Sequence, residues 1–280
     1  MAAGAYQSVR NYLKNVVYSM WGKAIDKALL EQGLAGLVAD LERLVPDITR
    51  QYSMFEVNTP YLRKKVRGLH AFQILLVNKV IEEFEKVTIV DIGDSSGTHI
   101  KYLLGLHSQN RGMHCLSVNL DKKAVERIRE KGLEAVCARA EDLPRYNINA
   151  DIFLCFETLE HLMNPGLFLH ELSSKTGADY LIVTVPYLRN SRVGLHHIRG
   201  NAEVPMNAEN THIFELDPED WKVLVRFSGW EIAEEKIFLQ YPRRSFFRML
   251  KPLFRKYDFE GFYGLILKRD DTWAALYSDW

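Results

Sequence analysis

The sequence predicts an α/β fold built on a doubly wound, mostly parallel sheet. Short β-branched apolar runs alternate with segments of helical periodicity, and the first run ends at a glycine- and serine-rich turn that opens a helix. Such alternation is typical of parallel strands that helices cover on both faces. At 280 residues, 47% of them hydrophobic, the chain is long enough to bury one large core.

The first part of the chain is predicted to be helical, because apolar residues recur at helical spacing from Tyr6 to about Glu85. We expect residues 1–86 to form a helical N-terminal cap and residues 87–280 to form the main domain. The cap holds several polar and aromatic residues just before the first strand, and no motif distinguishes any of them from ordinary helix residues. They are Tyr52, Arg67, His70 and Gln73.

Seven strand-like runs follow, and the last two are expected to pair with each other. A helix that precedes these last two strands is marked by Asp217 and Pro218 at its start and by Gly229 at its end. Another helical pattern spans Asp121 to Lys131. The predicted strands are residues 87–93, 114–120, 133–138, 150–156, 180–185, 231–239 and 262–268.

Composition argues against several classes of function. Lys and Arg together number 36, as do Asp and Glu, so no net charge draws the whole chain to nucleic acid or anionic lipid. The three cysteines are widely spaced, which favours a reduced protein over a disulfide scaffold. Without a signal-like or membrane-spanning run, we expect a soluble, cytoplasmic protein.

The turn after the first strand is the first candidate site. It contains Asp91, Gly93, Ser95 and Gly97, and its glycines would let a ligand approach the backbone at a helix N-terminus. In parallel sheets, ligands bind at this end of the strands. A phosphate-binding P-loop is excluded because Gly-Lys-Ser/Thr is missing, and the dinucleotide motif lacks its third glycine.

This turn resembles the first motif of the class I S-adenosylmethionine-dependent methyltransferases, close to those of type 11/23, with Ser95 in place of the middle glycine. The resemblance implies a Rossmann-like fold with S-adenosylmethionine as cofactor. Later motifs follow in the family's order, over about residues 87–268. By this resemblance Asp91, Gly93, Ser95 and Gly97 shape the methionine-side pocket, Asn119 or Asp121 binds the ribose, Asp142 contacts the adenine, and Phe156 lies beside the methyl donor.

A second candidate site follows the fourth strand. If a helix opens there, Glu157, Glu160 and His161 share one face, where two carboxylates and an imidazole suit a divalent metal. The cluster is similar to that of ubiquinone-pathway O-methyltransferases and of small-RNA terminal 2′-O-methyltransferases. That resemblance adds His212 as a fourth ligand and implies that the metal lowers the pKa of an acceptor hydroxyl, which attacks the methyl group.

Two readings without a metal stay open for this cluster. Glu160 and His161 can cap the helix or pack near the cofactor, as in many methyltransferases. Alternatively, His161 serves as the catalytic base, with Glu157 beside the reacting centre.

Two basic segments bear on the substrate. The first is a predicted lid over residues 186–215, whose cations favour an anionic or polyhydroxylated acceptor unless they are merely solvated. The second, residues 243–256, interleaves basic and aromatic residues and suits peripheral contact with a membrane, a lipid-linked substrate or a nucleic acid, or else an amphipathic connector. The candidate substrate residues of the lid are Arg189, Arg192, His196, His197 and Arg199.

Together these features predict an S-adenosylmethionine-dependent enzyme that methylates an oxygen of a sugar-containing or polyhydroxylated small molecule or glycan, with metal assistance as an option. Nucleic acid is disfavoured by the neutral charge and the lack of an RNA-binding module. A ubiquinone-like phenolic acceptor is the alternative enzyme. A cofactor-binding scaffold without activity is the alternative from another class.

Overall fold

The computed structural model describes residues 18–52, 56–109, 112–146, 148–194, 211–242 and 260–277. The expected helix start near Tyr6, the lid residues His196, His197 and Arg199, and the segment 243–256 lie outside these ranges.

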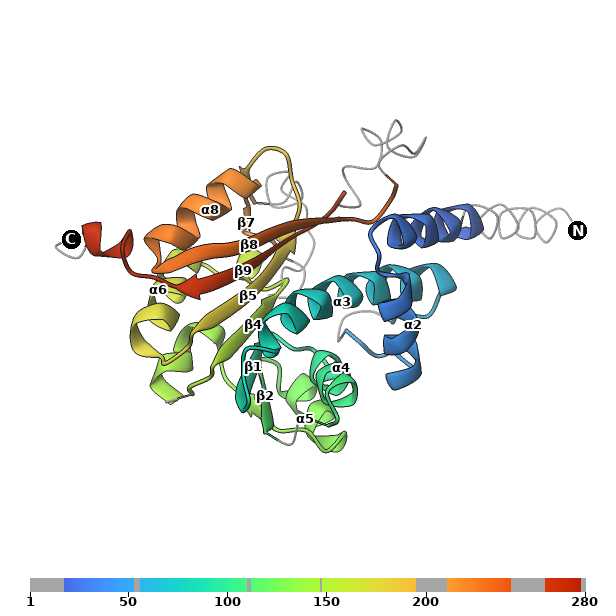
Figure 1. Cartoon of the computed structure of the whole chain (residues 1–280), viewed down its shortest axis with the longest axis horizontal. Helices are drawn as coiled ribbons and strands as arrows, with labels where there is room; N and C mark the ends of the chain where they lie inside the picture. Colours follow the sequence, from blue (N-terminus) through green and yellow to red (C-terminus); the bar gives the residue numbers. More distant parts are fainter. Residues whose placement is uncertain are drawn as a thin grey trace, which may run out of the picture.

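A seven-stranded sheet forms the centre of the molecule, with strand order β3-β2-β1-β4-β5-β9-β8 (Figure 1). The first five strands are parallel, and β9 runs antiparallel between β5 and β8. This arrangement confirms the α/β prediction and the expected pairing of the last two strands, which the structure shows to be antiparallel. The bounds are β1 Val87–Ile92, β2 Met113–Asn119, β3 Ala135–Cys137, β4 Ile152–Phe156, β5 Tyr180–Pro186, β8 Trp230–Leu239 and β9 Gly261–Arg269.

The helices begin and end largely where the sequence signals predict. Asp217 caps α8 by accepting from the amides of Glu219 and Asp220, and Gly229 follows the helix with φ at 91°. Residues 18–31 are also helical. The bounds are α2 Ala35–Leu44, α3 Pro60–Ile81, α4 Thr98–Leu106, α5 Lys122–Glu130, α6 Pro165–Lys175 and α8 Pro218–Phe227, with 3₁₀ segments η1 Ala140–Tyr146, η2 Leu159–His161 and η3 Ala274–Tyr277.

The sheet is buried on both faces. Ile182 of β5 packs in the same core as Phe72 of α3, whereas its neighbour Leu181 packs with Phe168 of α6. Adjacent strand residues therefore serve different cores, which explains why these strands are apolar throughout. Figure 1 shows α3 crossing one face, with α6 and α8 toward the other. No helix in the described ranges is long and apolar enough to cross a bilayer.

Candidate functional site

The glycine loop, residues 91–97, connects β1 to α4. Gly93 and Gly97 adopt φ of 88° and 72°, in the left-handed region that glycine enters without strain. A side chain at Gly93 would also collide with the Thr158 hydroxyl. The loop thus takes the sharp turn that its glycines predict, and it lies against the loop that follows β4.

Asp94 organises this loop, a role that no motif in the sequence marks. Its carboxylate accepts from the Ser96 amide at 3.1 Å, the Gly97 amide at 2.7 Å and the Ser117 hydroxyl at 2.8 Å. Its backbone carbonyl accepts from Asn119 Nδ2 at 2.9 Å. Each polar atom of Asp94 that shapes the turn is therefore paired within the protein.

The N-terminal region closes over the same loop through Gln51, which is buried. The Ser95 hydroxyl donates to the Gln51 carbonyl at 2.7 Å, and the Ser96 hydroxyl donates to Gln51 Oε1 at 2.9 Å. Serine in place of the family's middle glycine thus supplies a hydrogen bond to the N-terminal region. Gly97 itself gives α4 no side-chain cap, and the Asp94 carboxylate accepts from the Gly97 amide just before the helix begins.

The other predicted cofactor residues lie at the ends of neighbouring strands. Asn119 ends β2 and also accepts from the Asp121 amide at 2.7 Å, while Asp121 caps α5 by accepting from the Lys123 amide. Asp142 lies half-buried in η1. Phe156 ends β4, where its ring meets His99 edge-on with the centroids 5.0 Å apart.

The predicted helix that opens at Glu157 is wrong. Glu157 has φ at 48°, which a right-handed helix cannot contain, and only the short 3₁₀ turn η2 follows before Leu162 returns to extended backbone. Leu159 and Leu162 are buried and anchor this turn in the core. The turn still brings the side chains of Glu160 and His161 together.

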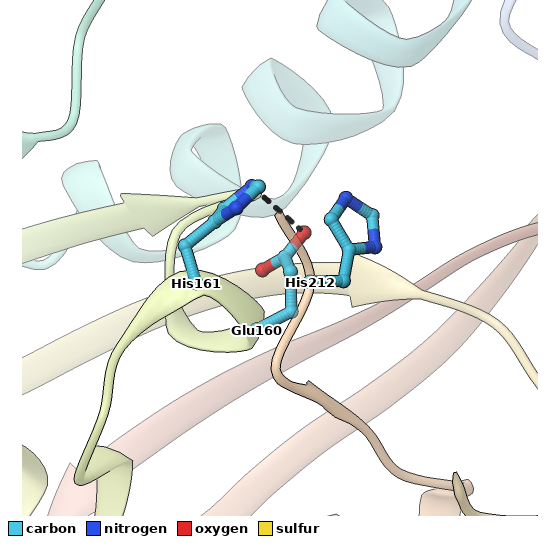
Figure 2. A group of neighbouring side chains, drawn as sticks. All are labelled: Glu160, His161 and His212. Atoms are coloured by element: carbon cyan, nitrogen blue, oxygen red, sulfur yellow. Dashed lines mark ion pairs between the residues drawn. The ribbon is translucent and has the colours of Figure 1, made fainter. Parts of the chain in front are cut away.

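His212 joins them from a segment much later in the chain. Its neighbour Ile213 donates its amide to the Glu160 carbonyl at 2.7 Å, which holds the two segments together. One ligand atom from each of Glu160, His161 and His212 lies within 4.8 Å of the others. Figure 2 shows the two imidazoles on either side of the Glu160 carboxylate, and their rings are perpendicular with centroids 4.7 Å apart.

Outward hydrogen bonds fix both imidazoles. His161 Nδ1 lies 3.0 Å from the carbonyl of Thr211, and His212 Nδ1 lies 3.0 Å from Glu215 Oε1. A carbonyl or carboxylate oxygen can only accept, so each Nδ1 carries hydrogen. In the neutral form of either ring, Nε2 then keeps its lone pair as a potential metal ligand.

The Glu160 carboxylate is 1% exposed, and neither oxygen accepts a hydrogen bond from any described residue. His161 Nε2 lies 4.0 Å from Glu160 Oε1, too far for a hydrogen bond. Burial raises the pKa of Glu160 far above its usual value, and the nearby Glu157 raises it further. Burial likewise raises the pKa of Glu157 to about 8.

His161 is held neutral, because burial and then the adjacent His212 lower its pKa to about 4. Behind His212, Glu215 is buried and also pairs with Arg192. Burial alone would raise the pKa of Glu215, but the hydrogen bonds from His212 and Arg192 outweigh it and lower that pKa. Glu215 thus stays charged and fixes the His212 ring.

Of the predicted substrate residues, Arg192 belongs to β6 (Arg192–Val193), which pairs with β7 (Phe214–Glu215). Arg189 pairs with Glu260 at 3.2 Å and is exposed. The two described lid arginines therefore have protein partners, Glu215 for Arg192 and Glu260 for Arg189.

Comparison with known proteins agrees with this geometry. The family model for methyltransferase domains matches residues 90–175, from within β1 through α6. A search of curated protein sequences found no match.

Three solved structures share the fold. The [4+2]-cyclase SpnF has a TM-score of 0.54 at 14% identity, over 85% of this chain and 93% of that chain. A methyltransferase complex with the Trm112 activator of Haloferax volcanii has a TM-score of 0.53 at 14% identity, over 74% and 92%. A protein described as a sarcosine dimethylglycine methyltransferase of Galdieria sulphuraria has a TM-score of 0.52 at 10% identity, over 75% and 88%.

The seven-stranded sheet and the glycine turn at the end of β1 define a Rossmann-like α/β protein with its ligand site at the carboxyl ends of the strands. The matched methyltransferase domain covers that turn and the loop after β4. Residues 90–175 of the chain therefore form part of a methyltransferase domain on a Rossmann-like fold.

Proposed function

We propose that this methyltransferase transfers its methyl group to an oxygen of a sugar-containing or other polyhydroxylated acceptor, and that a divalent cation assists the transfer. The observation that supports the proposal is the Glu160 carboxylate, which is buried and without a hydrogen-bond donor among the described residues. Two imidazoles whose Nδ1 atoms face outward flank it.

The donor set fits a divalent cation. A buried carboxylate without a partner costs free energy, and neighbouring Glu157 adds a second negative charge unless a proton or a cation is present. Oxygen and neutral imidazole ligands suit manganese, iron or zinc. Glu160, His161 and His212 would hold the cation. Glu157, the fourth predicted ligand, lies outside this group of ligand atoms but next to the Glu160 carboxyl.

The glycine loop suits the methionine end of the cofactor. Its first helix amides lack a side-chain cap, and Asp91 lies buried at the end of β1. Asn119 or Asp121 would contact the ribose and Asp142 the adenine. Of the two ribose candidates, Asn119 also braces the loop through the Asp94 carbonyl.

When bound, S-adenosylmethionine supplies the methyl group and a divalent cation lowers the pKa of the acceptor hydroxyl. The protein's own residues orient the groups that take part. Glu215 and the Thr211 carbonyl fix the orientation of the two imidazoles, and Phe156 would provide an apolar surface beside the methyl donor. Because the pKa of His161 is near 4, a ligand role suits it better than the role of general base. Methyl transfer depends chiefly on bringing donor and acceptor into line.

Two further inferences accompany this proposal. A cation that holds two neighbouring oxygens would select acceptors with adjacent hydroxyls, which sugars and catechols share. We also infer a cytoplasmic location, since Cys115, Cys137 and Cys155 are unpaired thiols.

The test is a methyl-transfer assay on chelator-treated enzyme with radiolabelled S-adenosylmethionine, using glycans, nucleotide sugars and catechols as acceptors. We expect turnover on the sugar-containing acceptors that appears on addition of Mn²⁺. Turnover restricted to catechols would favour the phenolic alternative. Binding of S-adenosylhomocysteine without turnover on any acceptor would favour the scaffold, and full activity in chelator would refute metal assistance.

A further inference from the structure

A row of buried polar side chains runs from the glycine loop to Glu157. It consists of Asp91 on β1, His99 on α4, Gln73 on α3 and Thr184 on β5. Their exposed fractions are 1%, 7%, 1% and 0% respectively. A buried polar group without a hydrogen-bond partner destabilises the folded protein, so the hydrogen bonds of these four side chains need to be identified.

The row is continuous. His99 Nδ1 lies 3.0 Å from Asp91 Oδ2, and His99 Nε2 lies 3.0 Å from Gln73 Oε1. Gln73 Nε2 donates to the Thr184 hydroxyl at 2.9 Å. Thr184 is bonded to the last member, because its carbonyl accepts from the Glu157 amide at 2.9 Å and its hydroxyl stabilises the charged Glu157 carboxyl.

The bonds along the row have a direction and little freedom. Because the Gln73 carbonyl oxygen can only accept, His99 Nε2 carries a hydrogen. The Thr184 hydroxyl oxygen accepts from Gln73, so its own hydrogen is available to the Glu157 carboxyl, whose pKa that hydroxyl lowers. The His99 ring also meets the rings of His70 and Phe156 edge-on, with centroids 4.8 Å and 5.0 Å away. Its nitrogens and its ring are therefore all held.

We propose that Gln73 is a positioning residue that couples the glycine loop to the Glu157 and Glu160 pair, so that ordering one end strengthens binding at the other. The proposal rests on the function proposed above for those two ends. Gln73 itself lies on α3, outside both strand-end loops, and reaches them through its two hydrogen bonds. Coupling of this kind is reciprocal by thermodynamic necessity.

The test measures whether a substitution near Glu157 changes the affinity of the glycine loop for S-adenosylhomocysteine. Calorimetry measures S-adenosylhomocysteine affinity of chelator-treated wild type, Thr184→Val, Gln73→Met and the double variant. We expect Thr184→Val to weaken binding about five-fold, Gln73→Met to weaken it at least as much, and the double variant to be no weaker than Gln73→Met. Thr184→Ser, which keeps the hydroxyl, should bind like wild type.

The matched control is Asn78→Leu, at a residue on the same helix as Gln73 but outside the row. It removes a hydrogen bond of 2.9 Å between Asn78 Oδ1 and His107 Nε2. It should leave this affinity within about two-fold of wild type. Unchanged affinity in Thr184→Val, equal losses in the valine and serine variants, or additive losses in the double variant would overturn the proposal. If Gln73→Met does not fold, the comparison of Thr184→Val with Thr184→Ser is sufficient to test the proposal.

Since this readout needs no metal, it separates the two proposals. A parallel Mn²⁺ titration of the same proteins tests the cation site. Absence of Mn²⁺ binding throughout would refute the proposed metal while leaving the coupling to be judged on S-adenosylhomocysteine affinity.

Discussion

The glycine loop and the cluster of Glu160, His161 and His212 both lie at the carboxyl ends of parallel strands, yet their polar groups are satisfied differently. In the loop, the Asp94 carboxylate accepts from two amides and a hydroxyl. In the cluster, the Glu160 carboxylate is equally buried but accepts from no described residue. The loop is complete within the protein, whereas the cluster requires an added proton or cation.

Substitution of Glu160 should have the largest effect on the difference between the loop and the cluster. We expect Glu160→Gln to weaken Mn²⁺ binding more than about a hundred-fold, because it removes the central oxygen ligand. In chelator, the same variant should be about 1–3 kcal/mol more stable than wild type at neutral pH, because the folded wild type must hold a proton on Glu160 that the unfolded chain releases, whereas glutamine needs none. Calorimetry and denaturant unfolding measure the two effects.

Glu171→Gln is the matched control, since this α6 carboxylate pairs with Lys175 near the surface. It should change neither quantity appreciably. Tight Mn²⁺ binding by Glu160→Gln would show that the cation, if any, binds elsewhere.

The residue behind His212 should have the next largest effect. Glu215→Leu removes the acceptor that fixes the His212 ring, and we expect Mn²⁺ affinity to fall about ten- to a hundred-fold. Arg189→Met is the control, because its partner Glu260 lies outside the cluster. Equal Mn²⁺ affinity in wild type and Glu215→Leu would contradict the orienting role.

The pH dependence of stability sharpens the comparison. Burial raises the pKa of Glu157 to about 8 and that of Glu160 well above its usual value, so the folded protein keeps protons that the unfolded chain loses above about pH 4.5. The free energy of unfolding in chelator should therefore fall as pH rises from 5 to 8, by at most about 1.4 kcal/mol per pH unit for each group.

Saturating Mn²⁺ should reduce or reverse this fall, because the cation replaces the protons. Glu160→Gln should flatten it, since one of the two titrating carboxyls is gone. Denaturant unfolding across this pH range measures the dependence of the free energy of unfolding on pH. An identical dependence in wild type and Glu160→Gln would contradict the raised pKa of Glu160.

The smallest effects are expected in the completed loop. Asn119→Ala removes the bond to the Asp94 carbonyl, and we expect S-adenosylhomocysteine affinity to fall about five-fold, roughly the cost of one hydrogen bond. Asp121→Ala, which removes the α5 cap, should cost less affinity. The reverse order in calorimetric titrations would assign the ribose contact to Asp121.

The sequence predicted what depends on local pattern. Strand periodicity, the Asp217 cap and the glycine turn are encoded within a few residues, and the structure confirms them. The predicted helix at Glu157 failed because contacts of the buried η2 turn, made far along the chain, override the local spacing.

Contacts between distant segments could not be predicted in the same way. Gln51 meets Ser95 and Ser96 across more than forty residues, and Asp94 meets Ser117 across 23. The serine at a position that the family fills with glycine became interpretable only with the structure, which shows that its hydroxyl donates to the Gln51 carbonyl.

The central claim is that the cluster holds a divalent cation, and electron paramagnetic resonance tests it directly. Mn²⁺ is titrated into chelator-treated wild type and Glu160→Gln while the signal of the free ion is recorded. We expect wild type to suppress that signal until one ion per chain has been added, and Glu160→Gln to leave it intact. A free-ion signal of full intensity with wild type, even with S-adenosylhomocysteine present, would contradict the account.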